Sequence, residues 1–447
     1  MGQDIPALVR WVLQQLEQAG YQGYLVGGCV RDLLRNAIPQ DWDICTSARP
    51  EEIEQVFSGC PMADTGRQHG TITVLAQGGP YEITTFRVDG EYSDGRRPDA
   101  VRFVSELEAD LARRDFTVNA MAMDGRGRIY DPFGGQADLR AGVIRCVGTP
   151  ERRFQEDALR VMRGIRFCSV LGFSMEAGTA QGVHACRRGL ERVAAERIRQ
   201  ELTKLLQGPD VGRVLREFAD VLWVFWPELE QMVGVEQHNP WHRWDVWEHT
   251  VRAVECVPPD LVLRLTMLLH DLGKPVCRTT DREGIDHFYG HQTHSARMAG
   301  EMLERLRFDR RTKRQVVELV TIHDERLRLE DGYLRHQISH LGVERWHQLL
   351  TIQRADRIAQ GSGRSAAALE QLEQIARRGE ALIQSGSCLG LKELDIDGNH
   401  LLAAGVPAGA AVGEILRRLL DLVLEGRVAN RRGELLQAAR QLYPLER

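Results

Sequence analysis

Two aspartates, a glycine and an arginine near the start of the sequence have the types and spacing of a metal- and phosphate-binding site. Asp41 and Asp43 stand two residues apart in "DWDI", and on a strand residues i and i+2 point to the same side. Carboxylates held this close repel unless a cation lies between them, and Mg²⁺ prefers carboxylate and phosphate oxygens. Gly28 in "LVGGCVRD" lets backbone N–H groups reach a triphosphate, and Arg31 adds a charge-assisted contact. The pattern predicts metal-dependent phosphoryl or nucleotidyl transfer, although Asp-x-Asp alone is more often part of an exposed strand or turn.

A second group of metal-ligand residue types lies between residues 249 and 356. It consists of His249, His270, Asp271, His291, His323 and Asp356. Imidazoles and carboxylates at several helical positions are typical ligands of one or two divalent transition metals, and metal-bound water can attack a phosphoester. His294, beside His291, could instead be a surface histidine.

The segment "EDALRVMRGIRF" (156–167) predicts a helix that distinguishes nucleobases. On a helix Asp157 and Arg160 share a face. Cytosine and adenine both carry an amine beside an unprotonated ring nitrogen, so a carboxylate can accept from the amine while an arginine donates to the nitrogen. Uracil and guanine would leave both groups unpaired. Arg163 and Arg166 continue the stripe as phosphate or packing contacts, while an ordinary surface salt bridge remains the simpler explanation of the Asp–Arg pair alone.

The surrounding pattern predicts an α+β protein. Short alternating segments between residues 21 and 145 predict a small mixed β-sheet in an N-terminal head, after an amphipathic first helix. From residue 149 onward helical periodicity dominates and predicts a long, mostly α-helical neck, body and tail. We divide the chain into a head (1–148), a neck (149–230), a metal-binding helical domain (231–380) and a tail (381–447).

Composition excludes several classes of protein. The 447 residues, 43% of them hydrophobic, contain no apolar run long enough to span a membrane, and the N-terminus does not resemble a signal peptide. Nine cysteines without a Cys-x-x-Cys pair suit a reducing cytoplasm. A formal net charge of −5 gives no overall indication of nucleic-acid binding. Local arginine clusters are nevertheless compatible with a polyanionic partner.

Five segments in this order resemble the motifs of bacterial class II tRNA nucleotidyltransferases, the CCA-adding enzymes, and of the related bacterial poly(A) polymerases. They are "LVGGCVRD…DWDI", "RRDFTVNAMAMD", "DPFGGQADL", "EDALRVMRGIRF" and "ERIRQEL". The resemblance is strong over residues 20–210 and looser over the tail at 394–439.

The resemblance implies roles for individual residues. Asp41 and Asp43 would bind Mg²⁺, and Gly28, Arg31 and Arg114 would contact the nucleotide. Glu82, in "YEITTFR", stands where nucleotidyltransferases place a third catalytic carboxylate, although a solvated strand glutamate is the commoner interpretation.

The group from His249 to Asp356 resembles the metal site of the HD superfamily of phosphohydrolases, which implies a divalent transition metal and phosphatase or cyclic phosphodiesterase activity. The site could equally survive as part of an RNA-positioning scaffold.

The expected activity is template-independent addition of CCA to the 3′ end of tRNA from CTP and ATP, with the helical tail contacting the tRNA. The segment 88–104 resembles the flexible loop of enzymes that add the terminal A. Poly(A) synthesis, A-only addition, a hydrolase with an RNA-binding head and a non-enzymatic RNA-binding scaffold remain alternatives. The sequence does not give the oligomeric state.

Overall fold

The computed structural model describes residues 5–76, 79–90, 101–362 and 365–443 of the chain. The chain divides into two compact units, residues 1–230 with 305–308 and residues 231–304 with 309–447. The predicted head and neck lie in the first unit, and the predicted metal-binding domain and tail lie in the second. The finer division into four domains stays a prediction.

The first unit contains a seven-stranded mixed sheet with the strand order β3-β4-β5-β2-β1-β8-β9. Strands β2 and β5 pair in parallel, while the other neighbouring strands pair antiparallel. The strands are β1 (Gly23–Val26), β2 (Ile44–Thr46), β3 (Met62–Gly66), β4 (Thr71–Ala76), β5 (Gly79–Thr85), β8 (Ala122–Met123) and β9 (Ile129–Tyr130). A separate antiparallel pair, β6 (Arg87–Asp89) and β7 (Val101–Phe103), flanks residues 90–100.

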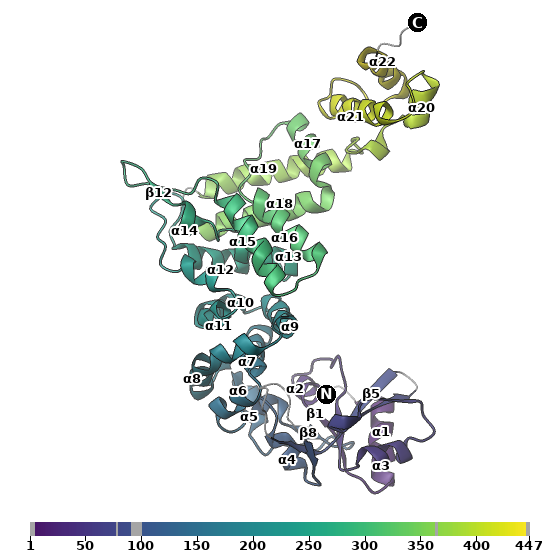
Figure 1. The fold of residues 1–447 in the computed structure, drawn as a ribbon, viewed down its shortest axis with the longest axis vertical. Coiled ribbons are helices and arrows are strands. Elements are labelled where there is room, and N and C mark those ends of the chain that lie inside the picture. The colour runs from purple at the N-terminus through teal and green to yellow at the C-terminus, as the bar shows by residue number, and fades with distance from the viewer. Residues whose placement is uncertain (1–4, 77–78, 91–100, 363–364, 444–447) are drawn as a thin grey trace. The chain divides into compact units, whose positions relative to one another are not determined.

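Alternating side chains give this sheet two apolar faces. Leu25 and Ile44 join one core, whereas the next residues along each strand, Val26 and Cys45, join a second core. Helices α1 (Ala7–Gln18) and α3 (Pro50–Val56) pack against the first face (Figure 1). The predicted first helix is confirmed as α1, which buries four apolar residues at helical spacing, namely Val9, Val12, Leu13 and Leu16.

The remainder of the first unit is mostly helical and carries the predicted base-selecting segment. Helix α7 packs against α9 and α10. The helices are α2 (Gly28–Leu34), α4 (Leu107–Ala112), α5 (Gly135–Ala141), α6 (Pro150–Glu156), α7 (Leu159–Leu171), α8 (Ala177–Cys186), α9 (Ala195–Leu206), α10 (Val211–Glu217) and α11 (Ala219–Trp223). Strands β10 (Val143–Ile144) and β11 (Ser174–Met175) form a short parallel pair.

The second unit consists mainly of helices. Helix α12 packs on α13 and α18, and α18 packs on α17 and α19 (Figure 1). The helices are α12 (Val246–Glu255), α13 (Leu261–Leu269), α14 (Lys274–Cys277), α15 (His291–Arg305), α16 (Arg310–Ile322), α17 (Asp331–Leu341), α18 (Val343–Gln360), α19 (Ser365–Gln384), α20 (Gly398–Ala403), α21 (Ala410–Leu424) and α22 (Arg432–Leu442). Helices α20, α21 and α22 share a core of their own, and β12 (Thr279–Thr280) pairs with β13 (Asp286–His287). The predicted fold class, a mixed-sheet head followed by a mostly helical body, is confirmed.

Candidate active site and candidate metal centre

Gly27 forms the turn between β1 and α2 and brings two charged side chains to the same stretch of backbone. Its φ of +75° and ψ of −131° suit glycine and are rare for residues with a side chain. A Cβ atom built on Gly27 would lie 3.0 Å from Nη1 of Arg114 and 3.7 Å from Oδ2 of Asp43. Gly28 begins α2, and Arg31 follows one turn later. The turn therefore places backbone N–H groups, a guanidinium and a carboxylate close together.

The expectation that Asp41 and Asp43 lie on a strand is wrong. Strand β2 begins at Ile44, because its partner β1 ends at Val26 before the Gly27 turn. The last contact of this ladder is the hydrogen bond that the Val26 N–H donates to the Asp43 carbonyl over 3.0 Å. Both aspartates are exposed in the irregular segment that precedes the strand.

Asp41, Asp43 and Glu82 nevertheless line one cavity. The parallel register pairs Ile44 of β2 with Ile83 of β5, so the residues just before them, Asp43 and Glu82, lie at the same edge of the sheet. Desolvation by the surrounding protein raises the pKa of Asp43, the Arg114 guanidinium opposes this rise, and the Asp41 carboxylate adds to it. Carboxylates that repel one another in a shared cavity fit the ligand preference of Mg²⁺.

Three arginines surround one aromatic ring on the neck side of this unit. The guanidinium carbons of Arg31, Arg163 and Arg166 lie 5.2, 5.5 and 3.8 Å from the centroid of the Phe167 ring. Each guanidinium also has a polar partner: Asn119 for Arg31, Asp115 for Arg163 and Glu201 for Arg166. The Arg166–Glu201 pair is largely buried, which favours the packing alternative for Arg166, whereas the Arg163 side chain is 35% exposed.

The structure corrects the expectation that Asp157 and Arg160 share one face of a helix. Asp157 lies between α6 and α7 with extended backbone, so the two residues are not on one continuous helix. Oδ2 of Asp157 lies 3.2 Å from Nη2 of Arg197. The Arg160 guanidinium instead donates to Glu156 and to the carbonyls of Arg153 and Arg113, at 2.8, 3.2 and 3.1 Å. Glu156 is the last residue of α6, four positions before Arg160, and the break between α6 and α7 leaves its carboxylate beside the Arg160 guanidinium.

The predicted flexible loop at 88–104 lies partly outside the described residues. Its expected mobile part, Asp94–Asp99, falls in the undescribed segment 91–100. The described flanks are the paired strands β6 and β7.

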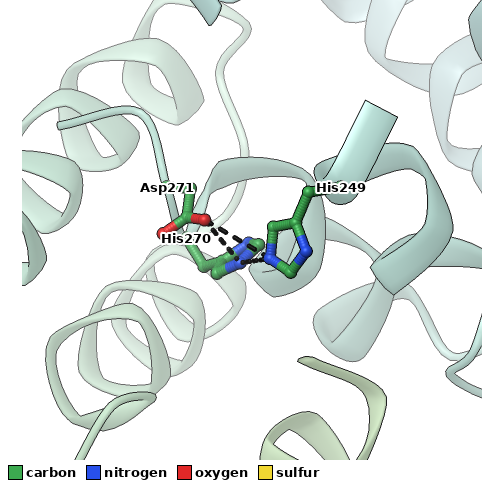
Figure 2. A group of neighbouring side chains, drawn as sticks. All are labelled: His249, His270 and Asp271. Atoms are coloured by element: carbon green, nitrogen blue, oxygen red, sulfur yellow. Dashed lines mark hydrogen bonds and ion pairs between the residues drawn. The ribbon is translucent and has the colours of Figure 1, made fainter. Parts of the chain in front are cut away.

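In the second unit, the structure brings all six predicted metal ligands into one buried cluster. The residues come from five helices or the residues directly after them: His249 from α12, His270 and Asp271 directly after α13, His291 at the start of α15, His323 directly after α16, and Asp356 from α18. His249, His270 and Asp271 offer ligand atoms within 4.8 Å of one another, and so do Asp271, His291 and His323. Figure 2 shows the first group, in which both imidazoles face the Asp271 carboxylate. Asp271 is common to both groups and could bridge two ions.

Backbone carbonyls orient three of these imidazoles. Nδ1 of His270, His291 and His323 lies 2.7, 2.8 and 2.7 Å from a carbonyl oxygen three residues earlier. A carbonyl can only accept, so each Nδ1 carries a proton and each Nε2 atom faces the cluster, where a metal ion could take the place of its proton. Nε2 of His249 lies 2.9 Å from Oδ1 of Asp356, and its Nδ1 has no partner among the described residues.

The electrostatics of the cluster favour positive charge. Burial would raise the pKa of Asp271, but the neighbouring His270 and Lys274 hold it well below its ordinary value. Asp356 is likewise held low against burial, by His249 and His270. Two anionic carboxylates among imidazole Nε2 atoms are a suitable donor set for divalent transition metals.

Two residues beside this cluster were missed at the sequence level. Nζ of Lys274 lies 2.6 Å from Oδ2 of Asp271, 2.8 Å from Oε1 of Gln237 and 3.4 Å from Nε2 of His242. Lys274 stands three residues after Asp271 in "LLHDLGKP", and that proximity was the available signal. No sequence signal pointed to His242, because a turn in the distant segment 239–242 brings its ring to the cluster. His294 is exposed and belongs to neither ligand group.

Comparisons with known proteins agree with the fold of both units. The family model described as "Poly A polymerase head domain" matches residues 23–145, and "Probable RNA and SrmB- binding site of polymerase A" matches residues 172–230. A tRNA nucleotidyltransferase domain 2 model matches residues 280–439. A CCA-adding enzyme of Lactobacillus johnsonii is 36% identical over 94% of this chain and 93% of its own length. The chain belongs to the family of CCA-adding enzymes.

Two further members of this family are also similar to this chain. The CCA-adding enzyme of Lactobacillus delbrueckii subsp. bulgaricus is 51% identical over 46% of this chain, and the match spans about half of that relative, 52% of its length. The crystal structure of the Bacillus stearothermophilus CCA-adding enzyme in complex with CTP superimposes with a TM-score of 0.67 and 30% identity, covering 97% of this chain and 96% of that one. The predicted family, and with it the assignment to the nucleotidyltransferases, is confirmed. None of the helices in the described part of the chain is long and apolar enough to cross a membrane.

Proposed function

We propose that this chain adds CCA to the 3′ end of tRNA from CTP and ATP, without a nucleic-acid template. The observation that carries the proposal is the convergence of Asp43, Arg114 and the Gly27 turn beside a cavity that Asp41 and Glu82 also line. In each cycle the tRNA 3′ oxygen forms a bond to the α-phosphorus of the nucleotide. The bond to the β-phosphate oxygen breaks, and pyrophosphate leaves.

The residues of the turn bind and orient the nucleotide. N–H groups at the start of α2, with Arg31 and Arg114, hold the triphosphate by charge-assisted hydrogen bonds. Arg163 adds positive charge from the neck. Asp41, Asp43 and Glu82 would hold Mg²⁺, which supplies activation of the attacking hydroxyl and charge neutralisation on the phosphates.

Base selection stays a proposal for Asp157 and Arg160. Asp157 offers a carboxylate to an exocyclic amine, and a guanidinium would donate to the ring nitrogen beside it. For Arg160 to do so it must exchange Glu156 or a carbonyl partner for the base. Asp157→Asn and Arg160→Met should therefore raise incorporation of U and G relative to C and A.

The deciding experiment uses a tRNA transcript that lacks CCA. With CTP alone the product should gain two C residues, with CTP and ATP together it should gain CCA, and sequencing of the 3′ ends reads the result. Failure to add C would overturn the proposal. Long A tails from ATP alone would indicate a poly(A) polymerase, and addition of A only to a transcript ending in CC would indicate A-only addition.

A protein that does not polymerise nucleotides would behave differently in the same assay. A hydrolase with an RNA-binding head, or a non-enzymatic RNA-binding scaffold, would incorporate no nucleotide, and Asp41→Ala would change nothing. A tRNA substrate also implies the cytoplasmic location predicted from the sequence.

We further propose a phosphohydrolase activity for the second unit. The cluster of His249, His270, Asp271, His291, His323 and Asp356 would hold one or two divalent transition metals, which supply a water of lowered pKa. The cluster opens into a cavity that the exposed side chains of Trp241 and Tyr289 also line. These aromatic rings suit a phosphoester with a planar group.

A phosphatase assay with Mn²⁺, Ni²⁺ or Zn²⁺ tests this second activity. Asp271→Ala should abolish hydrolysis of p-nitrophenyl phosphate and of 2′,3′-cyclic nucleotides and leave CCA addition intact. Unchanged hydrolysis would show that the activity arises elsewhere, and no hydrolysis by the wild type with any metal would favour an RNA-positioning scaffold.

A further inference from the structure

Asp110 is a buried carboxylate in α4 that binds the two arginines of the "RRD" segment. Its side chain is 0% exposed. Oδ1 accepts from Nε and Nη2 of Arg113 at 2.9 and 2.8 Å, and Oδ2 accepts from Nη2 of Arg114 at 3.3 Å. The N–H of Arg87 donates to Oδ1 over 3.3 Å. A single carboxylate thus satisfies donors from three residues.

The backbone of this segment is held independently from the neck. Arg153 donates to the carbonyl of Ala112, and Arg160 donates to the carbonyl of Arg113, each over 3.1 Å. With the backbone fixed at both carbonyls, the remaining freedom of Arg114 is in its side chain, and Asp110 contacts that side chain.

The Arg114 guanidinium reaches the proposed phosphate site from this anchor. Nη2 of Arg114 faces Asp110, while Nη1 lies 3.0 Å from the position that a Cβ on Gly27 would take. An arginine side chain loses substantial rotamer freedom when it binds. Because Asp110 holds Nη2 of Arg114, Nη1 already lies at the Gly27 turn before the nucleotide binds.

We propose that Asp110 is a positioning residue for nucleotidyl transfer, which orients Arg114 toward the triphosphate at the Gly27 turn. The inference rests on the proposed function of the site, because it assumes that the triphosphate binds there. The phosphates are common to CTP and ATP, so Asp110 serves both nucleotides equally. Burial would raise the pKa of Asp110, but Arg113 and Arg114 hold it below its ordinary value, so the carboxylate is anionic at neutral pH.

The test compares Asp110→Asn with the wild type in single-nucleotide addition to tRNA. Asparagine keeps the size of the side chain but not its charge. We expect KM for CTP and for ATP to rise by the same factor, on the order of tenfold, and the inhibition constant of pyrophosphate to rise with them. In an Arg114→Ala background the same change at Asp110 should leave KM unchanged.

Control variants separate positioning from simple stability. Asp124→Asn removes another carboxylate with arginine contacts in the same unit, whose partners Arg126 and Arg128 lie outside the proposed site, and it should not alter KM. If Asp110→Asn does not fold, Asp110→Glu takes its place in the same cycle. A fall in melting temperature with unchanged KM, or equal losses with and without Arg114, would overturn the inference. A wild type that adds no nucleotide would instead refute the proposed function.

Discussion

The Arg163 side chain from the neck helix α7 binds the Asp115 carboxylate, with Nε and Nη2 at 2.7 and 2.6 Å from Oδ2. Oδ1 of the same carboxylate accepts from the Asn119 side chain over 3.3 Å, and Asn119 accepts from Nη1 of Arg31 over 2.8 Å. A continuous chain of polar contacts therefore links Arg31, at the phosphate end, to the helix that carries the proposed base-selecting residue Arg160.

Replacement of Asp115 should destabilise the first unit. Asp115→Asn leaves the Arg163 guanidinium without its buried anionic partner, and we expect the free energy of unfolding to fall by about 3 kcal/mol. Urea unfolding measures this loss. Glu217→Gln, which removes an exposed partner of Arg213, is the control and should cost less than about 0.5 kcal/mol.

The pH dependence of the Asp115 effect follows from its pKa. Burial alone would raise the pKa of Asp115, but Arg163 lowers it to about 2, below the ordinary value of 3.8. A carboxylate with a lowered pKa stabilises the folded state above its unfolded pKa and loses this effect as the pH falls through its folded pKa. The difference between wild type and Asp115→Asn should thus be constant from pH 8 to pH 5. A difference that declines within this range would contradict an ionised, arginine-bound Asp115.

Replacement of Gly27 should impair the proposed active site more than it impairs folding elsewhere. Gly27→Ala forces a side chain into a backbone conformation that costs about 1–3 kcal/mol, and its Cβ would lie 3.0 Å from Nη1 of Arg114. We expect KM for both nucleotides to rise because Arg114 must move. Gly127→Ala is the matched control, since Gly127 also has a positive φ, +82°, but open space around it. Equal KM values in the two variants would show that the close approach at Gly27 has no role in binding.

The sequence predicted the elements better than the partners of charged side chains. Apolar alternation between residues 21 and 145 predicted the strands of the head, because inward-facing residues such as Leu25 and Ile83 must reach the core. The alternation around Asp41 and Asp43 failed, because where a strand begins depends on where its neighbour ends, and the Gly27 turn ends β1. The same segment still delivers both carboxylates to the cavity, since they directly precede the strand.

The acidic partners of the arginines could not be predicted from the sequence, for a different reason. Two acidic residues stand three and four positions before Arg160. Glu156, at the end of α6, binds it, whereas Asp157, between α6 and α7, binds Arg197. Nothing in the sequence distinguishes Asp110 and Asp115 from surface aspartates, because only the fold buries them. The cluster from His249 to Asp356 could be predicted from the sequence. Histidines and aspartates on or beside amphipathic helices come together when those helices pack. Its metal content stays a prediction.

Loss of a carboxylate at the proposed magnesium site should abolish nucleotide addition. Asp43→Asn removes one of the three carboxylates that would hold the cation, and we expect the rate of addition to fall by at least about 100-fold. Asp131→Asn is a suitable control, because Asp131 accepts hydrogen bonds from the N–H groups of Gly135 and Gln136 at the start of α5 and lies outside the cavity. Single-turnover addition of C to tRNA measures both variants. Retention of the wild-type rate in Asp43→Asn would exclude the proposed role of the pair.

Metal binding in the second unit should depend on Asp271, because this residue belongs to both ligand groups. After loading with Mn²⁺ or Zn²⁺ and desalting, elemental analysis should find bound metal in the wild type, and affinity should fall by at least about 100-fold in Asp271→Asn. His294→Ala is the matched control, because it removes an exposed histidine three residues after His291 on α15 and should retain the wild-type metal content. The proposed CCA addition should be equal in all three proteins, since the proposed Mg²⁺ site lies in the other unit. Equal metal content in Asp271→Asn and His294→Ala would mean that the buried cluster is held by its own ion pairs, with Lys274 as the cation beside Asp271.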